Sequence, residues 1–278
     1  MHKLFFIFSI FLALQGIAGT VDTVNIYSEA MQKAYNCVVV KPDSHSNKML
    51  SFETVFLLHG HGGSFGNLLY RIPQLKKYAD EFQLIIVCPE GKTSSWYFNS
   101  PIIDSMQFET YIAKEVPAFI DAHYNTIKKR TARAITGISM GGHGGLFLAF
   151  RHPDIFAACG SMSGALIINL IAIDKRYNIQ GLLGDSSFRQ RYMENSIMKA
   201  MEQYPKDSLA IIIDCGTEDF IIEMSRMVHK KMLQLKIPHD YTERPGRHDW
   251  TYWRNALPYQ LMYFRKFFDS KKTGSTAN

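Results

Sequence analysis

Short apolar runs alternate along this chain with longer segments in which apolar residues recur every three or four positions. The short runs have the length of strands, and Pro42 and Pro89 close two of them. Several are apolar almost throughout, which is typical of strands covered on both faces. The predicted strands are residues 23–27, 35–40, 53–58, 84–88, 132–136, 156–161, 209–215 and 241–244.

The segments between these runs have helical spacing. The predicted helices are residues 66–82, 108–124, 220–235 and 250–268, together with a segment that begins after Ser139. We expect the second of them to bend or restart around Pro117. Alternating strands and helices predict an α/β fold with a mostly parallel sheet wrapped on both faces, and no repeat or linker divides it. We therefore expect one domain over residues 19–269.

Two segments depart from this alternation. Residues 164–207 follow a strand at the side of an α/β sheet where ligands bind, so they are either a lid over the site or a plain crossover connection. Residues 270–278 are polar and are predicted to form a disordered tail.

A glycine-rich turn between a strand and a helix is the strongest chemical signal. Gly137-Ile-Ser139-Met-Gly141 fits the G-x-S-x-G pattern of a nucleophile elbow. Such a turn strains the serine, and glycines two residues away keep side chains clear of neighbouring backbone. We predict Ser139 as the nucleophile; the alternative is a structural serine in a glycine-rich turn.

A serine nucleophile needs a base and an orienting carboxylate, which this fold supplies in the chain order Ser, Asp or Glu, His. Among ten histidines, His248 has the required place, between the last strand and the final helix. Asp219, in the turn after the strand at 209–215, is the predicted acid, with Glu218 in reserve. Asp219 could instead only cap the next helix.

The oxyanion of such a reaction needs backbone N–H donors. Met140, directly after the nucleophile, and His61, in the glycine-rich loop after the strand at 53–58, are the predicted donors. A metal site at His59 and His61 is disfavoured because no carboxylate or cysteine at suitable spacing accompanies them, so we expect no metal.

Charge and composition exclude some partners. The net charge of +6 is spread over short clusters without a nucleic-acid motif, so we expect no nucleic-acid partner. The four cysteines lie in or beside apolar runs without metal-binding spacing, which favours free buried thiols.

The N-terminus has the pattern of a cleavable signal peptide. A basic start, an apolar run over residues 4–14 and Gly16-Ile-Ala18 predict cleavage near Ala18 and a secreted or periplasmic enzyme. The apolar run is short for a membrane span, so we expect no stable membrane anchor; the alternative is an uncleaved N-terminal anchor.

Four motifs together resemble a known family. They are Leu58-His-Gly-His-Gly-Gly63, Gly137-Ile-Ser-Met-Gly-Gly-His-Gly-Gly145, Cys215-Gly-Thr-Glu-Asp219 and Gly246-Arg-His-Asp-Trp250. Over residues 25–268 the chain is similar to the putative esterase family of α/β-hydrolases, which includes S-formylglutathione hydrolase (esterase D), tributyrin and feruloyl esterases and antigen 85 mycolyltransferases. The resemblance implies the α/β-hydrolase fold, the same triad and the same oxyanion donors. Ser95-Trp-Tyr97 resembles the family's aromatic segment near the acyl pocket, which implies that Trp96 and Tyr97 bind substrate.

The resulting expectation is an exported serine carboxylesterase without a cofactor. The resemblance implies short-chain or carbohydrate-linked acyl esters, of acetyl or feruloyl type, as substrates, and no pattern points to a particular oligomeric state. An acyltransferase on the same fold and a non-catalytic carbohydrate-binding module are the alternatives. Trp96 could equally be a core anchor.

Overall fold

The structure is a computed structural model that describes residues 19–185, 187–205 and 208–273. The predicted signal peptide, residues 1–18, lies outside the described residues.

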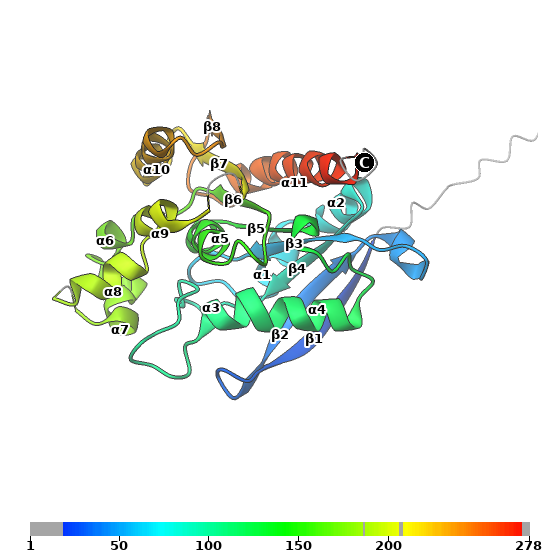
Figure 1. The fold of residues 1–278 in the computed structure, drawn as a ribbon, viewed down its shortest axis with the longest axis horizontal. Coiled ribbons are helices and arrows are strands. Elements are labelled where there is room, and N and C mark those ends of the chain that lie inside the picture. The colour runs from blue at the N-terminus through cyan, green and yellow to red at the C-terminus, as the bar shows by residue number, and fades with distance from the viewer. Residues whose placement is uncertain (1–18, 186, 206–207, 274–278) are drawn as a thin grey trace, which may run out of the picture.

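An eight-stranded sheet in the order β1-β2-β4-β3-β5-β6-β7-β8 forms the centre of the fold (Figure 1). β1 and β2 are antiparallel to their neighbours, and every pairing from β4 to β8 is parallel. All eight predicted strands are present. Their bounds are Thr20–Ser28, Lys33–Lys41, Glu53–Leu58, Leu84–Pro89, Arg133–Gly137, Ala158–Met162, Ala210–Gly216 and Asp240–Arg244.

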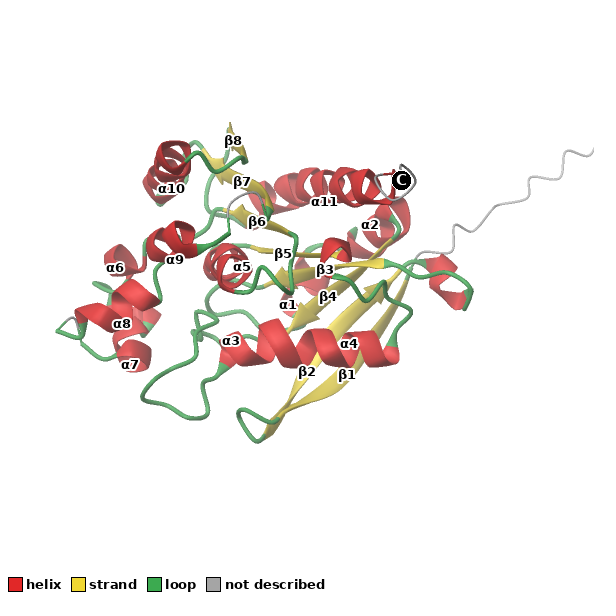
Figure 2. Cartoon of the chain, in the orientation of Figure 1, coloured by secondary structure: helices red, strands yellow, loops and turns green. Residues whose placement is uncertain are grey.

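Helices cover both faces of the sheet, so the predicted α/β-hydrolase architecture is confirmed (Figure 2). One face carries α1 (Asn67–Arg71), α2 (Leu75–Phe82) and α11 (Trp250–Thr273). The other face carries α3 (Phe108–Thr110), α4 (Val116–His123), α5 (Met140–Arg151), α9 (Ile197–Gln203) and α10 (Ile222–Leu235).

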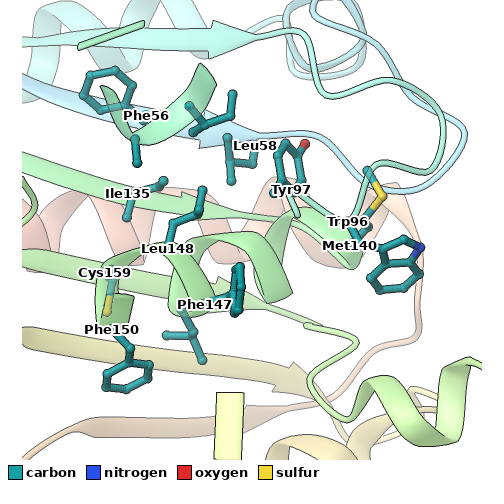
Figure 3. Packing of buried hydrophobic residues seen from close by; sticks show 14 of the residues in the cluster. Phe56, Leu58, Trp96, Tyr97, Ile135, Met140, Phe147, Leu148, Phe150 and Cys159 are labelled. Carbon is teal, nitrogen blue, oxygen red and sulfur yellow. The ribbon is translucent and has the colours of Figure 1, made fainter. Parts of the chain in front are cut away.

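The apolar core has two halves because alternate residues of each strand point to opposite faces. In β3, Phe56 and Leu58 pack with α5, whereas Val55 and Leu57 pack under the layer that includes α11. Figure 3 shows the first half, with the labelled side chains gathered between the strands and α5. Burial on both faces explains why these strands are apolar at almost every position.

Two predicted helices are subdivided. The helix expected over residues 66–82 is split into α1 and α2, because Pro73 has no N–H to donate and disfavours helical backbone at Ile72. The helix expected over residues 108–124 does restart near Pro117, as predicted. A π-helical turn, Tyr111–Glu115, joins α3 to α4 directly before that proline.

Residues 164–207 form a mainly helical connection between β6 and β7. It contains α6 (Ile168–Ile171), α7 (Ile179–Leu183), α8 (Arg189–Glu194) and α9, while residues 186, 206 and 207 lie outside the described part. α9 packs against α5 and α10, so the end of the segment belongs to the helical layer. Whether its first part moves as a lid stays a prediction.

The predicted disordered tail is wrong in its first residues. α11 continues to Thr273, so residues 270–273 are helical, and residues 274–278 lie outside the described part. An ion pair stabilises this extension of the helix, since the Lys272 ammonium lies 2.8 Å from the Glu53 carboxylate at the start of β3.

The four cysteines, Cys37, Cys88, Cys159 and Cys215, are free and buried, as predicted. Burial raises the pKa of Cys88 to about 12, so this thiol stays protonated and packs as a small apolar side chain.

The buried Glu53 carboxylate joins the sheet to α11. Arg265 donates to its two oxygens at 2.9 and 3.1 Å. Burial by itself raises the pKa of Glu53, but the hydrogen bonds from Arg265 and Lys272 lower it by more. The net pKa of Glu53 therefore lies below the usual value. The carboxylate is therefore ionised at neutral pH, and its charge is compensated by Arg265 and Lys272.

We expect Arg265→Met to lower the free energy of unfolding by about 3 kcal/mol at neutral pH, because it leaves a buried carboxylate with only part of its compensation. Urea denaturation measures this loss. Lys266→Met, on the neighbouring exposed position, is the matched control and should change stability by less than about 0.5 kcal/mol. Equal effects of the two substitutions would contradict the role assigned to the pair.

Candidate active site

Ser139 occupies a strained turn between β5 and α5. Its φ of 54° and ψ of −115° are unusual for a residue with a side chain. The chain can turn this sharply because the flanking glycines have no side chain to collide with the backbone that they contact. A Cβ at Gly137 would lie 2.6 Å from the Leu58 carbonyl oxygen, and one at Gly141 would lie 2.3 Å from the same atom. The glycines of the motif are therefore required by the contact between the turn and the end of β3.

The structure brings Ser139, His248 and Asp219 together. His248 Nε2 lies 2.9 Å from Ser139 Oγ, and His248 Nδ1 lies 2.8 Å from one Asp219 oxygen and 3.1 Å from the other. Each residue follows the carboxyl end of a different strand: β5, β8 and β7. The order of the contacts is that of a serine, a base and an orienting carboxylate.

Asp219 is almost fully buried, and its state decides the tautomer of His248. Burial alone raises the pKa of Asp219, but the hydrogen bond and charge of His248 and the Ile221 N–H outweigh it, so the net pKa is below the usual value. An ionised Asp219 accepts a hydrogen bond from the Nδ1–H group of His248 and so keeps the proton on Nδ1. The lone pair of His248 Nε2 then faces the Ser139 hydroxyl.

The other acidic residues near this turn have different partners. Glu218, the reserve candidate, is exposed and pairs with Arg247 at 3.1 Å. Asp214 is fully buried and accepts hydrogen bonds from Arg244 and from the Tyr252 hydroxyl. Because Arg244 ends β8 and Tyr252 lies in the first turn of α11, Asp214 binds both sides of the loop that carries His248.

The two predicted oxyanion donors lie beside the nucleophile. A Cβ at Gly60 would lie 3.3 Å from Ser139 Cβ, so the loop that carries His61 runs against the turn. Within the described chain, the Met140 and His61 N–H groups make no backbone hydrogen bond. Met140 is also the first residue of α5, where N–H groups have no partner inside the helix and favour negative charge.

Tyr97, predicted to bind substrate, is instead a buried support of this loop. It is fully buried, its hydroxyl donates to the His59 carbonyl at 2.9 Å, and it does not line the cleft. A Cβ at Gly144 would lie 2.4 Å from its ring, so the ring is wedged against α5. The substrate-binding prediction for Tyr97 is therefore wrong in this structure, because the ring is needed in the core.

His59 also stabilises the loop after β3, a role that the sequence did not predict. Its Nε2 accepts the Gly91 N–H at 3.0 Å, which leaves the proton on Nδ1 to be donated to the Gly60 carbonyl at 2.9 Å. Both partners are backbone, so the imidazole braces the loop. Among the residues that the structure describes, no three His, Cys, Asp or Glu side chains are grouped as a metal site would require.

Trp96 combines the two roles considered for it. Trp96 is 1% exposed and its Nε1–H donates to the Tyr177 carbonyl at 2.8 Å, yet it is also one of the residues that line the cleft. Figure 3 shows Trp96 and Met140 at the end of the core nearest the turn. Trp96 is therefore a core anchor that also forms part of the cleft wall.

A cleft of about 370 Å³ opens over Ser139. Its volume is at the lower end of the range for small-molecule sites, about 300–1,000 Å³. It is lined by Gly60, His61, Gly62, Gly63, Asn67, Arg71, Trp96, Ile138, Ser139, Ala165, Ile171, Tyr177, Phe220, Ile221, His248, Trp250 and Trp253. The wall mixes aromatic and aliphatic side chains with polar groups and glycine backbone.

Several of these lining residues were not predicted. Phe220 and Trp253 hold His248 edge to face, with ring centroids 4.8 and 5.0 Å from the imidazole. Their positions in the sequence could have predicted this contact with the imidazole, since Phe220 follows Asp219 and Trp253 lies five residues after His248. Ala165, Ile171 and Tyr177 were not singled out, although the 164–207 segment was already expected on this side of the sheet.

The chain matches the family described as "Putative esterase" over residues 28–264. It belongs to this esterase family.

An acetyl esterase from Caldicellulosiruptor saccharolyticus is 26% identical over 266 residues, which cover 88% of this chain and 98% of that relative. A ferulic acid esterase of known structure is 27% identical with a TM-score of 0.77, over 90% of this chain and 99% of that one. A fluorophosphonate-binding serine hydrolase from Staphylococcus aureus, 22% identical with a TM-score of 0.79, covers 89% of this chain and 99% of its own, and shares the fold. This esterase is a serine carboxylic ester hydrolase.

His143 is a buried histidine of this esterase, one helical turn after Ser139, and it packs among Trp96, Phe98 and Phe147. Neither ring nitrogen makes a hydrogen bond of normal geometry within the described residues, although the ring lies near the Trp96 backbone. Burial lowers the pKa of His143 to about 3. The folded esterase therefore holds this imidazole neutral.

An acid-dependent loss of stability follows from this. Below the ordinary histidine pKa of about 6.5 the unfolded chain binds a proton at His143 that the folded chain does not, which destabilises the fold by about 1.4 kcal/mol per pH unit. We expect unfolding free energies, measured in urea from about pH 6 to about pH 4, to fall less steeply for His143→Gln than for the wild type. Parallel pH profiles would show that His143 does not couple folding to protonation.

Backbone strain at Ser139 gives another prediction. Replacing the serine by glycine relieves the strained φ, whereas alanine keeps it, so Ser139→Gly should unfold with a free energy about 1 kcal/mol higher than Ser139→Ala. The same pair of substitutions at Ser46, in an ordinary 3-10 helix, should give no such gain. Urea denaturation of the four variants tests this, and an alanine variant as stable as the glycine variant at position 139 would argue against strain.

Proposed function

We propose that Ser139, His248 and Asp219 form the catalytic triad of this carboxylesterase. The observation that carries the proposal is the continuous series of contacts from Ser139 Oγ through both nitrogens of His248 to Asp219. Ser139 Oγ attacks the ester carbonyl carbon while His248 Nε2 takes its proton. Asp219 accepts a hydrogen bond from the Nδ1–H group and stabilises the imidazolium that forms.

The negative charge on the carbonyl oxygen is held by the backbone N–H groups of Met140 and His61. Each such donor contributes about 3 kcal/mol of transition-state stabilisation in enzymes of this kind. The bracing of the His61 loop by His59 and Tyr97 supports this role, because a preorganised donor does not have to reorient during the reaction.

Collapse of the tetrahedral intermediate breaks the bond to the alcohol oxygen, which receives the proton from His248. Water then attacks the acyl-serine carbonyl and gives its proton to His248, and a second collapse releases the acid and restores the Ser139 hydroxyl. No step needs a cofactor.

We propose short-chain or carbohydrate-linked acyl esters, of acetyl or feruloyl type, as substrates. The cleft of about 370 Å³ has room for a small acyl group, and Trp96, Tyr177 and Trp250 line it with aromatic surface. The acetyl esterase and the ferulic acid esterase among the similar proteins support this range of acyl groups.

We also propose that the enzyme is exported to the periplasm or secreted, on the signal-peptide pattern of residues 1–18. Within the described part of the chain, no helix is both long and apolar enough to span a membrane.

Hydrolysis of p-nitrophenyl esters from acetate to octanoate, and of the ferulate, tests the triad and the acyl range together. The mature wild-type protein should prefer the shortest esters or the ferulate. Ser139→Ala should lose at least about 1,000-fold in kcat, because no other group can form the acyl-enzyme. Ser46→Ala, at an exposed serine, is the control and should keep full activity.

Two outcomes would contradict this function. A folded wild-type protein that hydrolyses no ester would remove the esterase assignment. Ester synthesis that exceeds hydrolysis when an alcohol acceptor is added would make the protein an acyltransferase on the same triad.

A further inference from the structure

The catalytic cleft contains a cation that the chemistry above does not use. Arg71, at the end of α1, is exposed and lines the cleft together with Asn67, one helical turn earlier. Neither side chain makes a hydrogen bond or an ion pair with any described residue. Two polar side chains on one helix face thus point at the cleft with their donors unused.

The charge of Arg71 is not neutralised by its surroundings. No acidic residue is among the described residues that line the cleft. The nearby cations Arg176 and Arg247 each have a partner, Asp174 and Glu218 respectively. Arg71 is therefore the cleft cation that remains open to an anionic ligand.

Aromatic side chains restrict where the Arg71 guanidinium can lie. Its central carbon is 5.7 Å from the Trp250 ring centroid and 5.8 Å from that of Tyr70. Both distances are within the range of a cation–π contact, and neither contact uses the N–H groups of the guanidinium as hydrogen-bond donors. Those N–H groups form a fork that matches the two oxygens of a carboxylate.

We propose that Arg71, assisted by Asn67, binds a carboxylate group of the ester substrate. The preferred substrates are thus esters that carry a carboxylate close to the reacting carbonyl, on either the acyl or the alcohol part. This proposal rests on the proposed function, because it assigns a specificity residue to the same cleft. A cation that only complements the C-terminal end of α1 would affect stability and not substrate choice.

Two matched pairs of esters locate the carboxylate. The acyl pair is p-nitrophenyl glutarate and the neutral p-nitrophenyl valerate, which have acyl chains of equal length. The alcohol pair is p-acetoxybenzoate and its neutral methyl ester. The kcat/KM of each ester is measured for the wild type, Arg71→Met, Arg71→Lys and the control Lys77→Met, which removes an exposed cation of α2 outside the cleft lining.

We expect Arg71→Met to lower kcat/KM by about 10- to 100-fold for the anionic member of one pair, mainly through KM, and to leave both neutral esters within about 2-fold. Arg71→Lys should be intermediate because it keeps the charge and loses the fork. High salt should reduce the preference of the wild type for the anionic ester. Lys77→Met should behave as the wild type.

The pair in which the loss appears shows whether the carboxylate belongs to the acyl or the alcohol part. Equal effects of Arg71→Met on the anionic and neutral members of both pairs would overturn the carboxylate site while leaving the esterase function intact. Absence of hydrolysis of all four esters by the folded wild type would overturn both.

Discussion

The contact between the end of β3 and the turn at Ser139 is the constraint on which the site depends. Leu58 pairs with Gly137 in the sheet, and its carbonyl leaves no room for a side chain at Gly137 or Gly141. This approach forces Ser139 into a strained conformation and places the His59–Gly63 loop next to it. One backbone contact thus sets the exposure of the nucleophile and the position of a proposed oxyanion donor together.

Buried polar side chains hold the remaining loops of the site. His59 and Tyr97 fix the loop after β3 through backbone partners, and Asp214 fixes both ends of the loop that carries His248. Each of these groups is satisfied by hydrogen bonds, so its burial adds rigidity without the cost of an unpaired polar group. The three site residues can therefore come from different strands and still meet within hydrogen-bond distance.

The cleft combines two kinds of surface from different parts of the chain. Trp96 and Tyr177 provide aromatic surface from the loop after β4 and from the 164–207 segment, whereas Asn67 and Arg71 provide polar groups from α1. The family relation establishes the ester chemistry of this chain. In the proposal for Arg71, selectivity among esters arises from α1, which lies outside the four motifs.

The sequence by itself determined the order of strands and helices, the turn at Ser139 and the positions of Asp219 and His248, because apolar periodicity and glycine spacing are local properties. The same local signals missed the split at Pro73 and the helical residues 270–273, where a proline and an ion pair with Glu53 intervene. Only the tertiary structure decided that Tyr97 supports a loop, that Glu218 pairs with Arg247 instead of His248, and that Arg71 and Tyr177 line one cleft. Those outcomes depend on contacts between residues far apart in the chain, which no local pattern records.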